Sequence, residues 1–138
     1  MSDALYQKAI VELARDASAA GSLTDADATV TRDNPLCGDR VTLQAKFAPD
    51  GSIAELKHHT RGCLLCQAGA AMAGRHAIGL TPQKAAAAEQ AVRGFLKDAA
   101  PAEEGWPELD YFVPVRAHKS RHDCVILAFD ALGALFKR

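Results

Sequence analysis

The stretch NPLCGDRVTLQAKFAPDG, residues 34–51, holds two turns and one strand, and it decides how the first half of the chain folds. Residues 40–47 alternate between apolar and polar side chains, as a strand with one buried face does. The Asp-Gly pair at 50–51 is a strong hairpin signal, because both residues tolerate the positive φ angles of tight turns. The flanking segments 28–32 and 52–60 are also strand-like, so we expect three short antiparallel strands.

Helical patterns surround these strands. Residues 4–20 have the spacing of a helix, and 64–79 is small and apolar enough to be a buried helix. A Thr-Pro pair then starts an amphipathic helix over 83–99, and a last helix runs from Cys124 to the end. Residues 100–123 are predicted to be a loop followed by an irregular segment. The predicted fold class is α+β, a three-stranded antiparallel sheet packed on one side by helices, with one helix at each terminus.

Length and composition limit the function. The 138 residues suit a single domain over 1–138. The 16 Lys and Arg residues nearly balance the 17 Asp and Glu residues, which argues against a nucleic-acid partner. Charges interrupt every apolar stretch before it reaches membrane-spanning length, so we expect no membrane partner. The N-terminus has no basic segment followed by an apolar one, so we expect no signal peptide and a cytoplasmic location.

Four cysteines are spread over most of the chain: Cys37, Cys63, Cys66 and Cys124. In a reducing compartment, scattered cysteines more often serve metal or sulfur chemistry, or pack in a core, than form disulfides. Cys37 lies in the turn before the central strand, Cys63 lies where the third strand gives way to a helix, and Cys124 begins the last helix. Because these three occupy the ends of elements, we expect them to converge on one point.

The neighbourhood of these cysteines favours thiolates. Amides at a helix N-terminus stabilise a thiolate, and so would Arg61 beside Cys63 and the basic segment 119–122 before Cys124. Three thiolates and the carboxylate of Asp39 would make four ligands for a tetrahedral site. Asp39 could instead cap its own turn.

The fourth cysteine leaves more than one interpretation open. Cys66 forms a C-x-x-C pair with Cys63, which alone indicates a dithiol redox pair or half of a zinc site. At a helix start, its thiol would lie one turn in and face roughly the same way as the first. Cys66 could also be a small buried core residue. His76 and His122 are predicted to be surface residues rather than ligands.

The chain resembles the U-type iron–sulfur cluster assembly proteins, namely IscU, SufU and the N-terminal domain of NifU, whose SufE/NifU-like fold it would share. The resemblance covers nearly the whole chain and is carried by four elements in order. These are the early LYQ helix, the stretch SLTDADATVTRDNPLCGDRVTLQ, the GC pair at 62–63 before a small-residue helix, and C-x-x-L-A-x-x-A-L from Cys124 to Leu132.

The resemblance implies the site and its chemistry. The residues that match Cys37, Asp39, Cys63 and Cys124 hold a nascent, transient [2Fe–2S] cluster or a Zn²⁺ ion in that family. A cysteine desulfurase delivers persulfide sulfur, most often to the cysteine matching Cys124, and the cluster then passes to a downstream apo-protein or carrier. Cys66 departs from the family pattern, so it could replace Asp39 as a ligand or act as a spare persulfide acceptor.

Within the family the chain is most similar to the SufU type. It carries a longer insertion between Cys63 and Cys124, roughly the predicted helix at 81–100, and it lacks the LPPVK segment of IscU. Arg121 matches an arginine of the SufU type, and Asp123 stands where IscU has a histidine. The expected partner is then a SufS-like desulfurase of the SUF system.

Two functions follow from this resemblance, and two others come from the residues alone. We expect a non-enzymatic scaffold that receives sulfur and assembles or relays a cluster, and the alternative is a zinc-dependent sulfurtransferase that activates the desulfurase. A thiol–disulfide protein built on Cys63 and Cys66 would need neither Cys37 nor Cys124, and the chain lacks the βαβ pattern typical of that class. A purely structural zinc site in an interaction domain is the fourth hypothesis.

Overall fold

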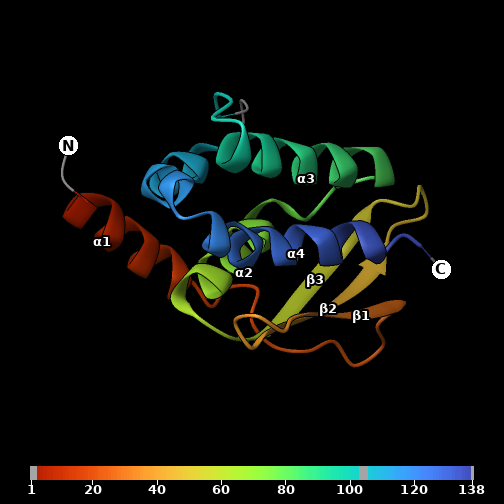
Figure 1. The fold of residues 1–138 in the computed structure, drawn as a ribbon. Helices are drawn as coiled ribbons and strands as arrows, with labels where there is room; N and C mark the ends of the chain where they lie inside the picture. The colour runs from red at the N-terminus through yellow and green to blue at the C-terminus, as the bar shows by residue number, and fades with distance from the viewer. Residues whose placement is uncertain (1–2, 103–105, 138) are drawn as a thin grey trace.

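The computed structural model of the chain describes residues 3–102 and 106–137. Three strands follow a first helix, and the second half is helical (Figure 1). The elements in order are α1 (Asp3–Ala14), β1 (Ala28–Asn34), β2 (Asp39–Phe47), β3 (Ile53–Arg61), α2 (Leu64–His76), α3 (Pro82–Lys97), the 3₁₀ helices η1 (Pro107–Ala117) and η2 (Lys119–Arg121), and α4 (His122–Ala134).

The strands form one antiparallel sheet in the order β1-β2-β3, as the alternating pattern predicts. The first hairpin closes at the pair Asn34 and Asp39, so a four-residue turn, 35–38, projects beyond the sheet. Within that turn Gly38 has a φ of +69°, in the left-handed region where glycine has no steric penalty. The second hairpin contains the Asp-Gly pair, and its Gly51 has a φ of +89°.

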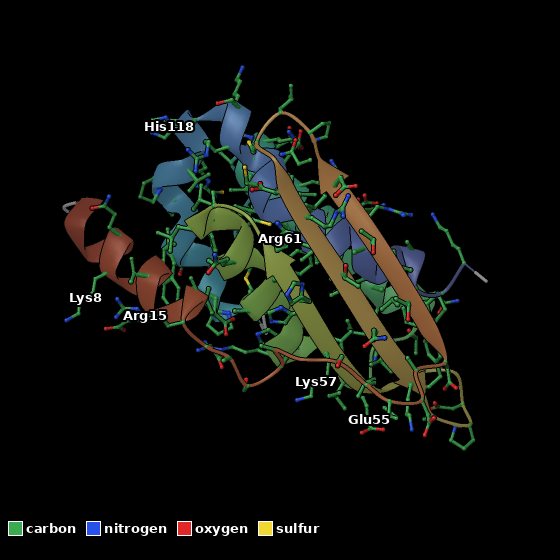
Figure 2. The ribbon with its side chains drawn as sticks, turned by 90° about the horizontal axis from the view of Figure 1, so that it is seen from below. Lys8, Arg15, Glu55, Lys57, Arg61 and His118 are labelled. Carbon is green, nitrogen blue, oxygen red and sulfur yellow. The ribbon has the colours of Figure 1, made fainter. Side chains whose placement is uncertain are left out.

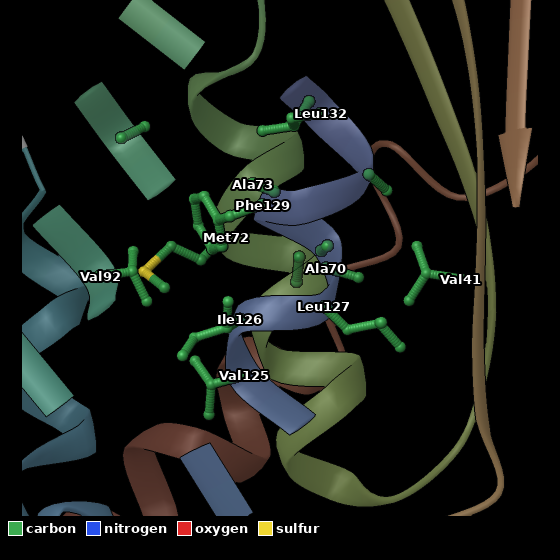
Figure 3. Packing of buried hydrophobic residues seen from close by; sticks show 14 of the residues in the cluster. Val41, Ala70, Met72, Ala73, Val92, Val125, Ile126, Leu127, Phe129 and Leu132 are labelled. Carbon is green, nitrogen blue, oxygen red and sulfur yellow. The ribbon is translucent and has the colours of Figure 1, made fainter. Parts of the chain in front are cut away.

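Helices cover one face of the sheet in two layers (Figures 1 and 3). The inward residues Val41 and Leu43 of β2 are fully buried, and α2 and α4 lie against this face. Helix α3 packs on the other side of α4, and Figure 3 shows Val41 and Val92 on opposite sides of this helical layer. Figure 2 shows the strands of the described residues in front of the helices, with the outer face of the sheet uncovered. The predicted fold class is therefore confirmed.

Helices α2 and α4 approach each other closely at Gly69. A Cβ atom built on Gly69 would lie 2.6 Å from the carbonyl oxygen of Val125, closer than real Cβ atoms come. The glycine therefore allows the two backbones to pack in contact. This packing fixes the start of α2, which carries Cys63, relative to the start of α4, which carries Cys124.

Helix α1 is shorter than predicted, because it ends at Ala14 rather than continuing to Ala20. The carboxylate of Asp16 accepts a hydrogen bond from the amide of Ser18 at 3.0 Å, which turns the chain. The same carboxylate accepts one from Arg75 at 2.7 Å, so a tertiary contact holds the turn. Alanine-rich sequence after this point favours helix locally, but these contacts override that preference.

The segment predicted to be irregular is largely 3₁₀ helix, in η1 and η2. The expected loop at 100–108 falls partly on residues 103–105, which lie outside the described residues, and η1 already begins at Pro107. In the described ranges, no helix combines the length and the apolar character needed to cross a bilayer.

Candidate metal and sulfur site

Three distant segments meet at the end of the sheet where the turn 35–38 projects. They are that turn, the start of α2 and the first turn of α4. The sulfur atoms of Cys37 and Cys124 lie 3.2 Å apart. The ligand atoms of Cys37, Asp39 and Cys124 all lie within 4.8 Å of one another, which is close enough for one metal ion to bind all three.

Cys63 lies at the edge of this group. Its Sγ is 3.9 Å from Oδ2 of Asp39, and its backbone amide donates a hydrogen bond to Oδ1 at 3.0 Å. Asp39 therefore faces the start of α2, where the unpaired amides favour a negative charge. The alternative in which Asp39 only caps its own turn does not describe this geometry, because the carboxylate bonds across to another element.

Gly62 has a steric reason to precede Cys63. A Cβ atom at this position would overlap Oδ1 of Asp39 and lie 2.9 Å from its Cγ. Only a residue without a side chain lets the buried carboxylate of Asp39, which is 1% exposed, approach the α2 backbone this closely. The Gly-Cys pair is thus part of the site and not only a junction between two elements.

Exposure differs sharply among the three cysteines of the site. Cys37 is exposed, Cys63 is half-buried, and Cys124 is 0% exposed. Burial raises the pKa of the Cys124 thiol well above its ordinary value, and hydrogen bonding with Cys37 and Asp39 raises it further. The sequence-based expectation that the helix N-terminus and basic neighbours would lower this pKa is therefore wrong, because burial outweighs the dipole.

Arg121 faces the thiols, as its position before Cys124 suggested. Hydrogen bonding with Cys63 and the charge of that group raise the pKa of the Arg121 guanidinium, and Cys124 contributes in the same direction. This cation can balance negative charge that develops on either sulfur. It also lines a cleft of about 380 Å³ together with Leu64, Val115 and His118, next to the half-buried Cys63.

Cys66 lies behind the site, in the core. It is 1% exposed and packs in the hydrophobic cluster. Burial raises the pKa of its thiol to about 12, and the nearby charges of Asp39 and Cys63 add to this effect. The group whose ligand atoms lie within 4.8 Å consists of Cys37, Asp39 and Cys124 and does not include Cys66.

The hydrogen bonds of His76 and His122 are made outside the group of cysteines and Asp39. His122 is 2% exposed, so its prediction as a surface residue is wrong. Its Nε2 lies 3.0 Å from the carbonyl oxygen of Val115 and 3.1 Å from that of Arg116, because α4 starts beneath η1. His76 is half-buried, and its Nε2 lies 2.8 Å from a carboxylate oxygen of Glu108.

One further residue of the site has no place in the ligand pattern read from the sequence. Asn34 is 7% exposed, and its side-chain amide lies 3.9 Å from the Cys124 sulfur, where it can donate a weak hydrogen bond. No local pattern marks this role, because in the sequence Asn34 is simply a polar residue at the end of a strand-like segment, immediately before Pro35.

The combination of this sheet, these helices and a Cys-Asp-Cys group agrees with comparison to known proteins. Residues 5–107 match the NifU-like N-terminal domain family, so the chain belongs to that family.

Individual relatives agree with this assignment. The chain is 28% identical to the iron–sulfur cluster assembly scaffold protein IscU of Thermotoga maritima, over 97% of this chain and 94% of that protein. The crystal structure of a nitrogen-fixing NifU-like protein (N-terminal) from Brucella abortus superposes with a TM-score of 0.89 and 36% identity, covering 98% of this chain and 94% of that one. An iron–sulfur cluster scaffold described for the SUF system of Fervidobacterium islandicum AW-1 has a TM-score of 0.84 at 22% identity, covering 99% of each chain, which is a likeness of fold.

Proposed function

We propose that this protein is a scaffold on which an iron–sulfur cluster is assembled and from which it is passed on. The observation that supports this most is the group of Cys37, Asp39 and Cys124, whose ligand atoms lie within 4.8 Å of one another. Cys63 supplies the fourth ligand, since its sulfur lies beside the same carboxylate. The whole chain acts as one domain of the NifU N-terminal type.

The mixed ligand set suits a cluster that must leave again. Thiolates are soft ligands that hold iron–sulfur clusters firmly, whereas a carboxylate is a harder and weaker partner for such a cluster. Asp39 therefore weakens one corner of the site. The four donors suit a transient [2Fe–2S] cluster, which is cargo for a downstream apo-protein or carrier and not a resident cofactor.

Sulfur reaches the site as the outer atom of a persulfide on a cysteine desulfurase. The Cys124 sulfur attacks that outer sulfur, the desulfurase sulfur leaves as a thiol that takes up the Cys124 proton, and a persulfide remains on Cys124. Arg121 balances the negative charge during this exchange. Because Cys124 is fully buried, the exposed turn that carries Cys37 must move aside to admit the donor.

A second function uses the same donors. Three thiolates and a carboxylate also suit Zn²⁺, and helix α3 with Arg121 matches features of the SufU type. In that case the protein is a zinc-dependent sulfurtransferase of the SUF system. A SufS-like desulfurase would exchange one of its own ligands onto the zinc and free Cys124 to accept sulfur. Both functions place the protein in the reducing cytoplasm.

Desulfurase assays with the zinc-loaded protein separate the two functions. The scaffold predicts that anaerobic addition of ferrous iron and sulfide gives a [2Fe–2S] visible spectrum that disappears on transfer to an apo-ferredoxin. It predicts little stimulation of desulfurase turnover by the zinc form. Strong stimulation with sulfur acceptance by the zinc form, and no cluster that can be transferred, would establish the sulfurtransferase instead.

A further inference from the structure

The sulfur atoms of Cys37 and Cys124 are in contact. Their separation of 3.2 Å exceeds a disulfide bond length of about 2.05 Å by only about 1.2 Å. The two residues are 87 positions apart, so this contact is made by the fold and not by local sequence. Asn34 lies next to the same pair, with its side-chain nitrogen 3.9 Å from the Cys124 sulfur.

The two thiols differ in their access to solvent. Cys37 is exposed on a turn whose next residue is Gly38, and the preceding Leu36 is 91% exposed. Cys124 is 0% exposed and fixed on a packed helix. A small oxidant in solution therefore meets Cys37 first, and the turn is the part that can move the remaining distance.

We propose that Cys37 and Cys124 form a hydroperoxide-responsive dithiol whenever the site holds no metal or cluster. The Cys37 thiolate attacks one oxygen of hydrogen peroxide, the O–O bond breaks, and the other oxygen departs as hydroxide and is protonated to water, which leaves Cys37 as a sulfenic acid. The Cys124 sulfur then attacks the Cys37 sulfur, and the S–O bond breaks. A second water leaves with the Cys124 proton, and the product is the Cys37–Cys124 disulfide.

The other two cysteines are less suited to this reaction. The Cys63 sulfur is half-buried and faces Oδ2 of Asp39 at 3.9 Å, whereas the exposed Cys37 sulfur already contacts the sulfur of Cys124. Cys66 is 1% exposed and packs in the core, where a peroxide molecule has little access. A purely local C-x-x-C disulfide between Cys63 and Cys66 is the competing outcome, and it is the one that the sequence pattern alone would suggest.

The disulfide would prevent metal and sulfur from being loaded onto the site. It removes two thiolate donors, so the oxidised protein can take neither metal nor persulfide sulfur at this site. A bound metal has the opposite effect, because it occupies both sulfurs and excludes attack on peroxide. A dithiol reductant restores the site by two exchange steps. This inference goes beyond the proposed function, because it concerns the chain without its cargo.

Peptide mapping of the full chain tests the proposal directly. Metal-free protein is treated with hydrogen peroxide, alkylated and digested with trypsin. Cleavage places Cys37 in the peptide 33–40, Cys124 in 122–137, and both Cys63 and Cys66 in 62–75. We expect 33–40 linked to 122–137 with the loss of two hydrogen atoms, reversal by dithiothreitol, and protection by prior addition of Zn²⁺.

Serine variants provide the controls. Because Cys37 is exposed, C37S should fold normally and lower the yield of peroxide-induced disulfide at least about tenfold, since no sulfenic acid can form at that position. C63S and C66S should retain the link between 33–40 and 122–137. A disulfide within 62–75, a link from 62–75 to either other peptide as the main product, or irreversible oxidation of Cys37 without any link would each overturn the proposal.

Discussion

Replacement of Gly62 by alanine should destabilise the metal-free protein through one contact. The added Cβ would overlap Oδ1 of Asp39 and lie 2.9 Å from Cγ and 3.0 Å from Cβ of the same side chain. Asp39 is buried between β2 and α2, so its carboxylate cannot swing into solvent without breaking its 3.0 Å hydrogen bond from the Cys63 amide. The side chain that gives way is therefore the proposed metal ligand itself.

The magnitude combines two costs. Overpacking of a close site costs about 1–3 kcal/mol, and loss of a buried hydrogen bond to a charged group costs about 1.5–3 kcal/mol. Because one displacement causes both, we expect Gly62→Ala to lower the unfolding free energy by about 2–4 kcal/mol. At a few degrees per kcal/mol for a chain of this size, the Tm falls by roughly 10 °C.

Urea unfolding of the reduced, metal-free protein measures this loss of unfolding free energy. A double-mutant cycle with Asp39 tests whether the contact between Gly62 and Asp39 causes it. In an Asp39→Ala background the two closest clash partners, Oδ1 and Cγ, are gone and only the 3.0 Å contact with Cβ remains, so Gly62→Ala should cost clearly less, about 1 kcal/mol. Gly94→Ala is the matched control, because its Cβ would meet only Ala100 at 3.7 Å and alanine favours the α3 helix. Equal costs of Gly62→Ala in the two backgrounds would refute the reasoning.

Three further predictions concern other parts of the site and fold. Asp39→Ala should retain a reconstituted cluster longer than the wild type during transfer to an apo-ferredoxin, because the weak carboxylate ligand is lost; faster loss would contradict this role. Cys66→Ser should lower the unfolding free energy by about 1–2 kcal/mol, as expected for a polar group in the core, and leave Zn²⁺ stoichiometry at the wild-type value, which metal analysis checks. The hydrogen bond from Arg75, followed by that from the Ser18 amide, lowers the pKa of Asp16 to about 2 from 3.8, so its stabilisation is full above the unfolded pKa and is lost as the pH falls through about 2. Asp16→Asn should therefore remove about 1 kcal/mol of acid-dependent stability, seen as a flatter dependence of Tm on pH in that window.

The strands and hairpins could be predicted because their signals are local. Alternation in 40–47 and the Asp-Gly pair specify strand and turn without reference to the rest of the chain. The end of α1 could not be predicted in this way. Ala17, Ala19 and Ala20 favour helix. The helix stops earlier because Asp16 accepts hydrogen bonds from the Ser18 amide and from Arg75, and Arg75 is 59 positions away.

Part of the candidate site could also be predicted from the sequence, and part could not. The motifs placed Cys37, Cys63 and Cys124 at the ends of elements, and the structure brings Cys37 and Cys124 together with Asp39 and places Cys63 beside that carboxylate. Burial was not readable, so the direction of the Cys124 pKa and the buried position of His122 were both missed. Both depend on η1 and α2 covering the start of α4, which no local pattern encodes.

The proposed donors of the site differ in how firmly the fold holds them, and this difference bears on the proposed loading and release of a cluster. Cys63 and Cys124 begin helices whose spacing is fixed where Gly69 meets the Val125 backbone. Asp39 is buried and bonded to the Cys63 amide, whereas Cys37 lies on an exposed turn beyond the sheet. Three of the proposed donors are therefore held firmly by packed elements, and the fourth, Cys37, lies on the exposed turn. Release of a cluster, entry of sulfur and reaction with an oxidant should each begin at Cys37, because displacement of that side chain disturbs the fewest packed contacts.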